Sequence, residues 1–295
     1  MLLNHHAIHK KGIFVLLTQT MDNIFVLCLV GFVIGTLGTL IGAGGGFILV
    51  PVLILAFPQL TPEQITAISL AVVFCNALSG SIAYARAKRI DWKAGLQFFL
   101  FTVPGSILGV YITKHINSKI FTLVFGLMLI ALSVMLFLRK DKSASPENKN
   151  NGLHANTNST LTDSNGETYS YSYNKYVGWA ISFAVGFISP ILGIGGGIIH
   201  VPAMVNWLSF PVHIATATSH FILAAMSLVS VIVHLAEGNY NSPLIIRLVV
   251  CIGIGVVVGA QLGAYLSHKL KATIIVKALA VALGIVGVRL LLQLL

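Results

Sequence analysis

Long apolar runs separated by short polar segments dominate the pattern of this chain. One series of runs with few charges covers residues 24–41, 47–57, 65–85, 94–113 and 120–138, and a second covers 177–192, 198–208, 215–235, 244–267 and 273–294. Most of these runs approach the ~20 residues that a helix needs to cross a bilayer. Because lipid offers no hydrogen bonds to the backbone, helices are the expected structure. The pattern predicts an all-α polytopic membrane protein with 8–10 spans.

The two series divide the chain into matching halves. Residues 21–138 form a first predicted transmembrane repeat and residues 177–295 a second, so each repeat holds four or five segments. Between them, residues 139–176 are rich in Asn, Ser and Thr, which predicts a flexible polar linker. Residues 1–20 are a polar, His-rich extension without the small-residue cleavage site of a signal peptide, and Met21 is a candidate for the true start.

A glycine cluster interrupts an apolar run at the same place in each half. The clusters are Gly42–Gly46 and Gly193–Gly197, and a Val-Pro pair follows each one. Gly44 and Gly195 stand 151 residues apart, as do Val50 and Val201. Glycine is costly inside a helix, so its recurrence at matched positions needs an explanation. Matched breaks in two halves are typical of transporters whose substrate binds at the repeat interface.

The apolar runs that follow the glycines, 47–57 and 198–208, are too short to cross a bilayer. At 1.5 Å per residue each spans only about half of it, which predicts half-helices. If each half has four crossings plus a re-entrant piece, the repeats run parallel. If the short piece also crosses, each half has five crossings and the repeats are inverted.

Loop charges favour the inverted arrangement slightly. Arg86, Lys88, Arg89 and Lys93 make the first-half loop strongly basic and hence cytoplasmic, whereas Glu237 and Arg247 cancel around the equivalent loop of the second half. Lys10 and Lys11 argue the other way, because a cytoplasmic N-terminus fits parallel repeats. We therefore expect inverted repeats, with the side of the N-terminus left open.

Composition excludes several classes of function. The chain is 56% hydrophobic and only 9% charged, unlike a soluble domain. Its net charge of +10 comes from residues in short loops and at span ends, which indicates cytoplasmic loops or attraction of an anion and not nucleic-acid binding. Enzyme motifs are missing, and Cys28, Cys75 and Cys251 lack metal-ligand spacing. We expect no enzyme activity, cofactor or metal.

The glycine clusters are the first candidates for substrate binding. Consecutive glycines leave backbone N–H groups free to converge on an anion, and the half-helix that follows directs its positive dipole end toward the same place. The predicted binding residues are Gly44, Gly45, Gly46, Gly195, Gly196 and Gly197. The alternative is that these glycines serve only close helix packing.

Small polar side chains and histidines in the neighbouring runs extend this predicted site. They are Ser69, Asn76, His200, Thr218, Ser219 and His220. Hydroxyl and amide groups could line a substrate path, although Ser and Thr in membrane helices also bond to their own helix. Intramembrane histidines could bind an anion or relay protons. Acidic residues are missing from the span centres, which suits an anionic cargo.

These motifs together resemble the sulfite exporter TauE/SafE family, the TSUP membrane permeases. The resemblance is carried by the repeated glycine–Val-Pro motif, by Ala217-Thr218-Ser219, by Arg89-Ile90-Asp91-Trp92, and by the paired glycines Gly105–Gly109 and Gly259–Gly263. It covers nearly the whole chain except residues 1–20 and the linker. One departure is Asn241, which stands where Asp91 in the first half predicts an acid.

The resemblance implies a multi-pass inner (plasma) membrane permease for small sulfur-containing anions, such as sulfite or organosulfonates. It implies export more often than import. Alternating access between the two repeats is the expected mechanism, and the lipid bilayer and a small anion are the expected partners, with a homodimer compatible. The alternatives are an anion channel, a permease for a small carboxylate or other anion, and an accessory membrane protein without flux of its own.

Overall fold

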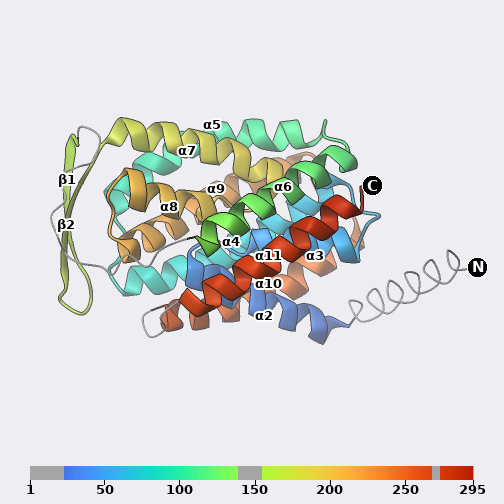
Figure 1. The fold of residues 1–295 in the computed structure, drawn as a ribbon, viewed down its shortest axis with the longest axis horizontal. Helices are drawn as coiled ribbons and strands as arrows, with labels where there is room; N and C mark the ends of the chain where they lie inside the picture. Colours follow the sequence, from blue (N-terminus) through green and yellow to red (C-terminus); the bar gives the residue numbers. More distant parts are fainter. Residues whose placement is uncertain (1–22, 139–154, 268–272, 295) are drawn as a thin grey trace, which may run out of the picture.

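The computed structural model describes residues 23–138, 155–267 and 273–294, and this part of the chain is almost entirely helical (Figure 1). The first half contains α2 (Ile24–Ile41), α3 (Gly46–Ala56), α4 (Pro62–Arg86), α5 (Trp92–Thr113) and α6 (Ser118–Phe137). The second half contains α7 (Lys175–Leu192), α8 (Gly197–Trp207), α9 (Val212–Ala236), α10 (Pro243–Leu266) and α11 (Thr273–Leu292). The predicted all-α polytopic class is confirmed. The N-terminal extension and Met21 lie outside the described residues.

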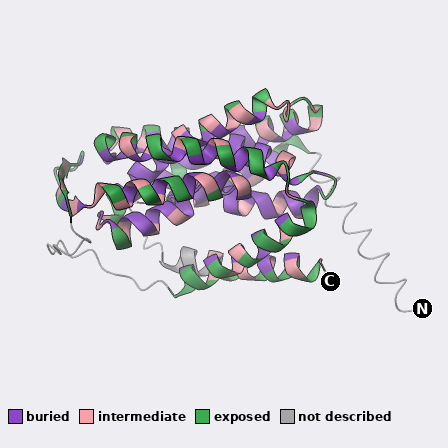
Figure 2. Ribbon diagram, turned by 90° about the horizontal axis from the view of Figure 1, so that it is seen from above, coloured by how far each residue is buried: buried purple, intermediate pink, exposed green. Residues whose placement is uncertain are grey.

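Seven of these described helices are long and apolar enough to cross a membrane. The helices α3 and α8 have only 11 residues each, as the short runs predicted. Buried residues concentrate in the middle of the bundle and exposed apolar residues cover its outer helices (Figure 2). That distribution is expected of a protein whose outer surface faces lipid.

Polar residues just before the apolar runs set the helix starts. A capping box between Thr61 and Gln64 begins α4, and the Asp91 side chain accepts from the Ala94 amide at the start of α5. At their other ends, α2 and α7 stop at Gly42 and Gly193, both in the left-handed conformation that glycine adopts without strain. The glycine clusters therefore end one helix and start the next.

Glycine contacts fix the directions of the packed helices. Gly31 and Gly35 of α2 lie against Ile252 and Val256 of α10, so these two helices run parallel. Thr102 of α5 contacts Gly186 of α7, and Gly109 contacts Pro190, so α5 and α7 are also parallel. In contrast, α4 runs antiparallel to α9, and α6 antiparallel to α11.

The bundle consequently has two distinct ends. We call the one formed by residues 86–91, 155–174 and 208–211 the hairpin end, and the one formed by 57–61, 114–117 and 237–242 the opposite end. Lys114 pairs with Glu237 at 3.8 Å, and Asn239 donates to Glu63, which holds the opposite end together. Because α2 runs parallel to α10, it starts at the opposite end, whereas α7 starts at the hairpin end (Figure 1).

The short helices α3 and α8 run back toward the end of the bundle from which α2 and α7, respectively, started. The C-terminal part of α3 lies beside the start of α4 at the opposite end, and that of α8 packs near the hairpin. Each half thus contains a helical V, formed by α2–α3 or α7–α8, followed by three long helices. The basic loop 86–93 and the start of α2 also lie at different ends, so only one of the two charge arguments can mark the cytoplasm.

Part of the predicted flexible linker 139–176 is an ordered β-hairpin. Strands β1 (Thr157–Thr162) and β2 (Thr168–Tyr173) pair antiparallel, with Thr157 opposite Tyr173 and Thr162 opposite Thr168. Residues 139–154 lie outside the description. Flexibility was the wrong prediction for 157–173, because alternating Thr, Ser and Tyr residues with an Asn165-Gly166 turn are strand formers despite their polarity.

The hairpin is fastened to helices of both halves. Arg89, after α4, donates to Asp163 at 2.9 Å, and Asp91 accepts from Tyr171 at 2.6 Å and from Ser159 at 2.8 Å. The rings of Tyr171 and Tyr173 pack on Phe210, which lies between α8 and α9. The hairpin therefore covers the loops that join α4 to α5 and α8 to α9.

Acid should release this hairpin. Burial raises the pKa of the Asp163 carboxyl, but hydrogen bonds from Arg89 and from the amides of Asn165 and Glu167 outweigh it, so the pKa lies below its ordinary 3.8. The attachment is complete above that ordinary value and is lost as the pH falls through the lower folded value. We expect hydrogen exchange of amides 155–174, corrected for intrinsic rates, to stay constant between about pH 7 and the ordinary pKa of 3.8 and to accelerate as the pH falls below that value.

The Asp163→Asn variant provides the control for this prediction. Losing one charge-assisted bond costs about 2 kcal/mol, so hairpin exchange at neutral pH should rise by about thirtyfold. The variant should also lose most of the acid dependence. Unchanged exchange in Asp163→Asn would mean that the pair does not hold the hairpin.

Candidate functional site

The two glycine loops lie against each other between the ends of the bundle. A side chain on Gly46 would place its Cβ 2.5 Å from the carbonyl oxygen of Gly193, and one on Gly197 would collide with the carbonyl of Gly42. Gly44, Gly45, Gly195 and Gly196 all have positive φ angles between 66° and 83°. Only glycine satisfies both the conformation and the close approach. The six predicted glycines are therefore brought together.

An apolar pair from the two long central helices fills the remaining space. A Cβ on Gly44 would lie 2.5 Å from Leu223 of α9, and one on Gly195 would lie 2.6 Å from Val73 of α4. Val73 and Leu223 are themselves fully or almost fully buried. The loops and this pair form a dry barrier across the middle of the molecule.

Both loops carry backbone N–H groups without an acceptor. In the described chain these are the amides of Gly45, Gly46 and Phe47 at the start of α3, and of Gly195, Gly196 and Ile198 at the start of α8. Free amides at a helix N-terminus, together with the helix dipole, favour a negative charge. Each loop thus has the backbone chemistry of an anion site.

Polar side chains distinguish the second loop from the first. Around Gly195–Gly197 lie Thr102, His200 and Ser219, bordering a void too narrow for a water molecule. His200 is 2% exposed, and its Nε2 lies 3.3 Å from the Ser182 hydroxyl. Around the first loop the corresponding contacts are apolar, with Ile34 against Gly45 and Leu49 at the position equivalent to His200. An anion would find more donors at the second loop.

Ser69 and Ser219 occupy equivalent positions but make different contacts. The Ser69 hydroxyl donates to the Gly193 carbonyl at 2.6 Å, which ties α4 to the end of α7. The Ser219 hydroxyl is buried and has no partner among the described residues. Ser69 therefore has a structural contact that occupies its only proton, whereas Ser219 keeps a donor available beside the second loop.

Asn76 of α4 and His220 of α9 form a second polar cluster, separate from the one around His200 and Ser219. Asn76 Oδ1 accepts from Thr39 at 2.9 Å, while its Nδ2 has no partner in the described structure. Both ring nitrogens of the fully buried His220 are likewise without a partner there. The Tyr84 ring meets the His220 ring edge-on with centroids 5.4 Å apart. Sequence reasoning missed Thr39 and Tyr84, although Thr39 lies only three residues before Gly42.

Thr218 lies away from the glycine loops. Its hydroxyl accepts from the Asp91 amide at 3.0 Å and so helps to fix the start of α5. Thr218, Ser219 and His220 are consecutive, and a helix turns 100° per residue, so they face three different neighbours. The single site predicted from the sequence is thus two clusters, around His200–Ser219 and around Asn76–His220, with Thr218 outside both.

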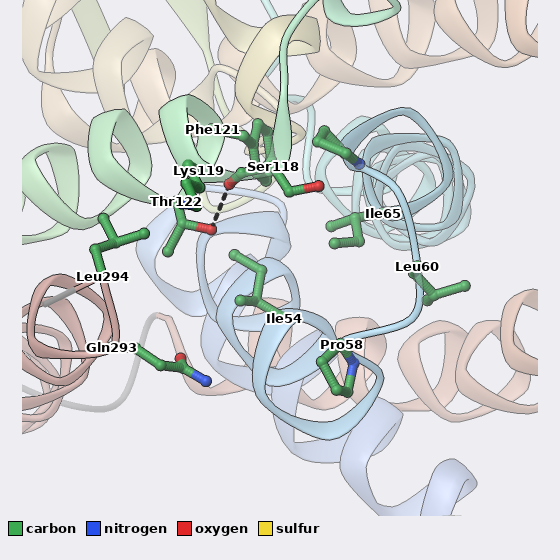
Figure 3. Close-up of a pocket in the computed structure, with 11 residues that line it drawn as sticks. Ile54, Pro58, Leu60, Ile65, Ser118, Lys119, Phe121, Thr122, Gln293 and Leu294 are labelled. Carbon is green, nitrogen blue, oxygen red and sulfur yellow. Dashed lines mark hydrogen bonds between the residues drawn. The ribbon is translucent and has the colours of Figure 1, made fainter.

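The larger cavity lies elsewhere, at the opposite end of the bundle. It has a volume of about 220 Å³ and is bordered by Ile54, Leu60, Phe121 and other mostly apolar residues of α3, α4, α6 and α11, with Lys119 at its edge (Figure 3). None of the predicted site residues borders it. Its polar lining residues are Ser118, Lys119, Thr122 and Gln293, and neither glycine loop borders it.

The different contacts of the two serines predict different effects on stability. Ser69→Ala should lower the free energy of unfolding by about 1–3 kcal/mol, because the buried Gly193 carbonyl loses its donor. Ser219→Ala removes a hydroxyl without a protein partner and should leave the melting temperature within about 1 °C of the parent. Thermal melts of both variants in the same detergent would test this. Equal destabilisation by both would contradict the asymmetry.

Comparison with known proteins agrees with this architecture. A family profile described as sulfite exporter TauE/SafE matches residues 27–290. The probable membrane transporter protein YunE of Bacillus subtilis is 37% identical over 271 residues, which is 90% of this chain and 96% of that protein. A probable membrane transporter protein of Methanocaldococcus jannaschii is 26% identical over 279 residues, covering 90% of this chain and 95% of the relative. No solved structure matches the chain.

Proposed function

Because this chain belongs to the sulfite exporter TauE/SafE family, we propose that it exports a small sulfur-containing anion, such as sulfite or an organosulfonate. The family and the similar proteins make it a membrane transporter and not an enzyme. The observation that carries the proposal is the second glycine loop, where free backbone amides, His200 and Ser219 surround one void. Those groups suit an oxyanion because they are donors without a competing carboxylate.

The anion binds at the start of α8 in this proposal. The amides of Gly195, Gly196 and Ile198 supply fixed dipoles, and the Ser219 hydroxyl adds a donor that the protein itself does not use. Ser189, also buried and without a described partner, lies beside Gly196. A void this narrow requires the helices to separate before an anion enters, which restricts the cargo to small ions.

Transport occurs by alternating access between two inverted halves. The opposite starting ends of α2 and α7 support inversion, because a half-turn that exchanges the halves would also exchange the ends. The basic residues Arg86, Lys88, Arg89 and Lys93 support a cytoplasmic hairpin end in an inner (plasma) membrane. Export of an anion from an inside-negative cell then gains about 2.3 kcal/mol per charge per 100 mV, so no coupling ion is needed.

Counterflow in proteoliposomes tests this function. Vesicles with the purified protein would be loaded with sulfite, sulfoacetate, taurine, sulfate or acetate, and exchange with the labelled anion would be followed with and without a membrane potential. Saturable exchange of a sulfur anion is the expected result. Ohmic currents would favour a channel, acetate exchange alone a carboxylate permease, and no flux of any anion in vesicles with folded protein would overturn the proposal.

We expect Ser219, beside the second loop, to contribute to anion affinity, and we expect the equivalent Ser69 not to contribute. Ser219→Ala should weaken anion binding by about tenfold, the effect of losing one hydrogen bond to a charged group. Ser69→Ala is the matched control and should leave the half-saturating concentration within about twofold, despite its lower stability. Concentration dependence of counterflow measures both values. Weakening by Ser69→Ala and not by Ser219→Ala would contradict this choice of donor, because Ser69 reaches the second loop through the Gly193 carbonyl.

A further inference from the structure

Two helix faces lead away from the glycine loops, and each carries one buried polar atom without a partner in the described chain, Asn76 Nδ2 on one and His234 Nε2 on the other. On α4, residues Asn76, Gly80 and Tyr84 share one face, because they are four residues apart. On α9, the residues at the equivalent positions are Met226, Ser230 and His234, each 150 residues further on. Since α4 and α9 are antiparallel, the first face leads to the hairpin end and the second to the opposite end.

Tyr84 closes the face that leads to the hairpin end. It is 3% exposed, and its hydroxyl donates at 3.1 Å to the carbonyl of Thr39 in the last turn of α2. Directly inside it lie the unpartnered nitrogens of His220 and Asn76. Gly80 makes room for this group, since a Cβ there would lie 2.6 Å from the His220 ring. Tyr84 thus covers these polar groups on the side of the hairpin end, and it is held there by its bond to Thr39 and by a hydrogen bond with the Ser267 side chain.

His234 closes the face that leads to the opposite end. It is completely buried, and its Nδ1 lies 3.1 Å from Asn239 Nδ2, which donates to Glu63 at 3.0 Å. Its Nε2 has no partner among the described residues. At the inner end of the same face, Met226 reaches Gly196 of the second loop. His234 therefore occupies the position equivalent to Tyr84 in the second half, and Asn239 holds it in place.

We propose that Tyr84 and His234 are paired gates at the two ends of one substrate path, and that both are shut in this structure. The proposal rests on the transport function above and adds the route and the residues that control it. Opening at the hairpin end breaks the bond from Tyr84 to Thr39. Opening at the opposite end breaks the chain from His234 through Asn239 to Glu63. The barrier of Val73 and Leu223 lies between the two gates.

Thiol labelling from each side of the membrane tests the gates without any substrate. The free thiols Cys28, Cys75 and Cys251 would first be replaced by alanine, and one reporter would be added. Asn76→Cys reports on access past Tyr84, and Ser230→Cys reports on access past His234. A membrane-impermeant maleimide would be applied to right-side-out and to inside-out vesicles, with each variant checked for a single folded peak.

We expect each gate variant to raise the labelling of one reporter, and to do so from one side of the membrane only. Tyr84→Phe keeps the ring and removes the hydroxyl, so it should raise labelling of the Asn76→Cys reporter by about fivefold, the population change for one neutral hydrogen bond. Asn239→Ala should raise labelling of the Ser230→Cys reporter similarly, from the other side of the membrane. Tyr111→Phe, a half-exposed tyrosine on α5, is the matched control and should change neither rate.

The possible outcomes separate this proposal from the choice of cargo. Acceleration from both sides, or no acceleration by either variant, would overturn the paired gates. One-sided acceleration in vesicles that fail to exchange any sulfur anion would support the gates and reject the sulfur-anion function. Normal sulfite counterflow with unchanged labelling would retain the cargo and reject the gates.

Discussion

Contact between two pieces of bare backbone is the constraint on which this structure depends. Gly46 meets the Gly193 carbonyl and Gly197 meets the Gly42 carbonyl, so the halves approach without intervening side chains. That closeness leaves several amides without acceptors, a cost that a structure in lipid tolerates only where something else can supply the bond. The α2–α3 and α7–α8 turns and the Val73–Leu223 barrier depend on this one contact.

The sequence predicts the helices well because span length and hydrophobicity are local properties. The predicted run 24–41 coincides with α2, whereas 65–85 misses the capped first turn of α4 at Pro62. The hairpin was missed because a judgement from composition treats Thr, Ser and Tyr as solvent-loving. Their alternation around Asn165-Gly166 was the available signal. Its anchoring partners, Arg89 and Asp91, are about 70 residues away, and no local pattern could supply them.

The candidate site shows a different limit of sequence reasoning. The glycines could be found because their spacing repeats, but the direction in which a helical side chain points depends on which neighbours pack beside it. Thr218, Ser219 and His220 therefore looked like one lining and serve three surroundings. The departure at Asn241 also has a physical account, because Asp91 accepts from Tyr171 of the hairpin, and the described residues contain one such hairpin, at the end of the bundle where Asp91 lies.

A hairpin at one end of the bundle makes the free energies of opening the two ends unequal. Two matched halves that exchange places would give states open at either end with nearly equal free energies, and each would be populated about equally. In the proposed alternating-access cycle, opening the hairpin end would break the contacts of Asp163 and Tyr171, which would add a free-energy offset to that state. The molecule would then favour the state closed toward the hairpin, and a ligand arriving from that side would meet a smaller competent fraction and a weaker apparent affinity.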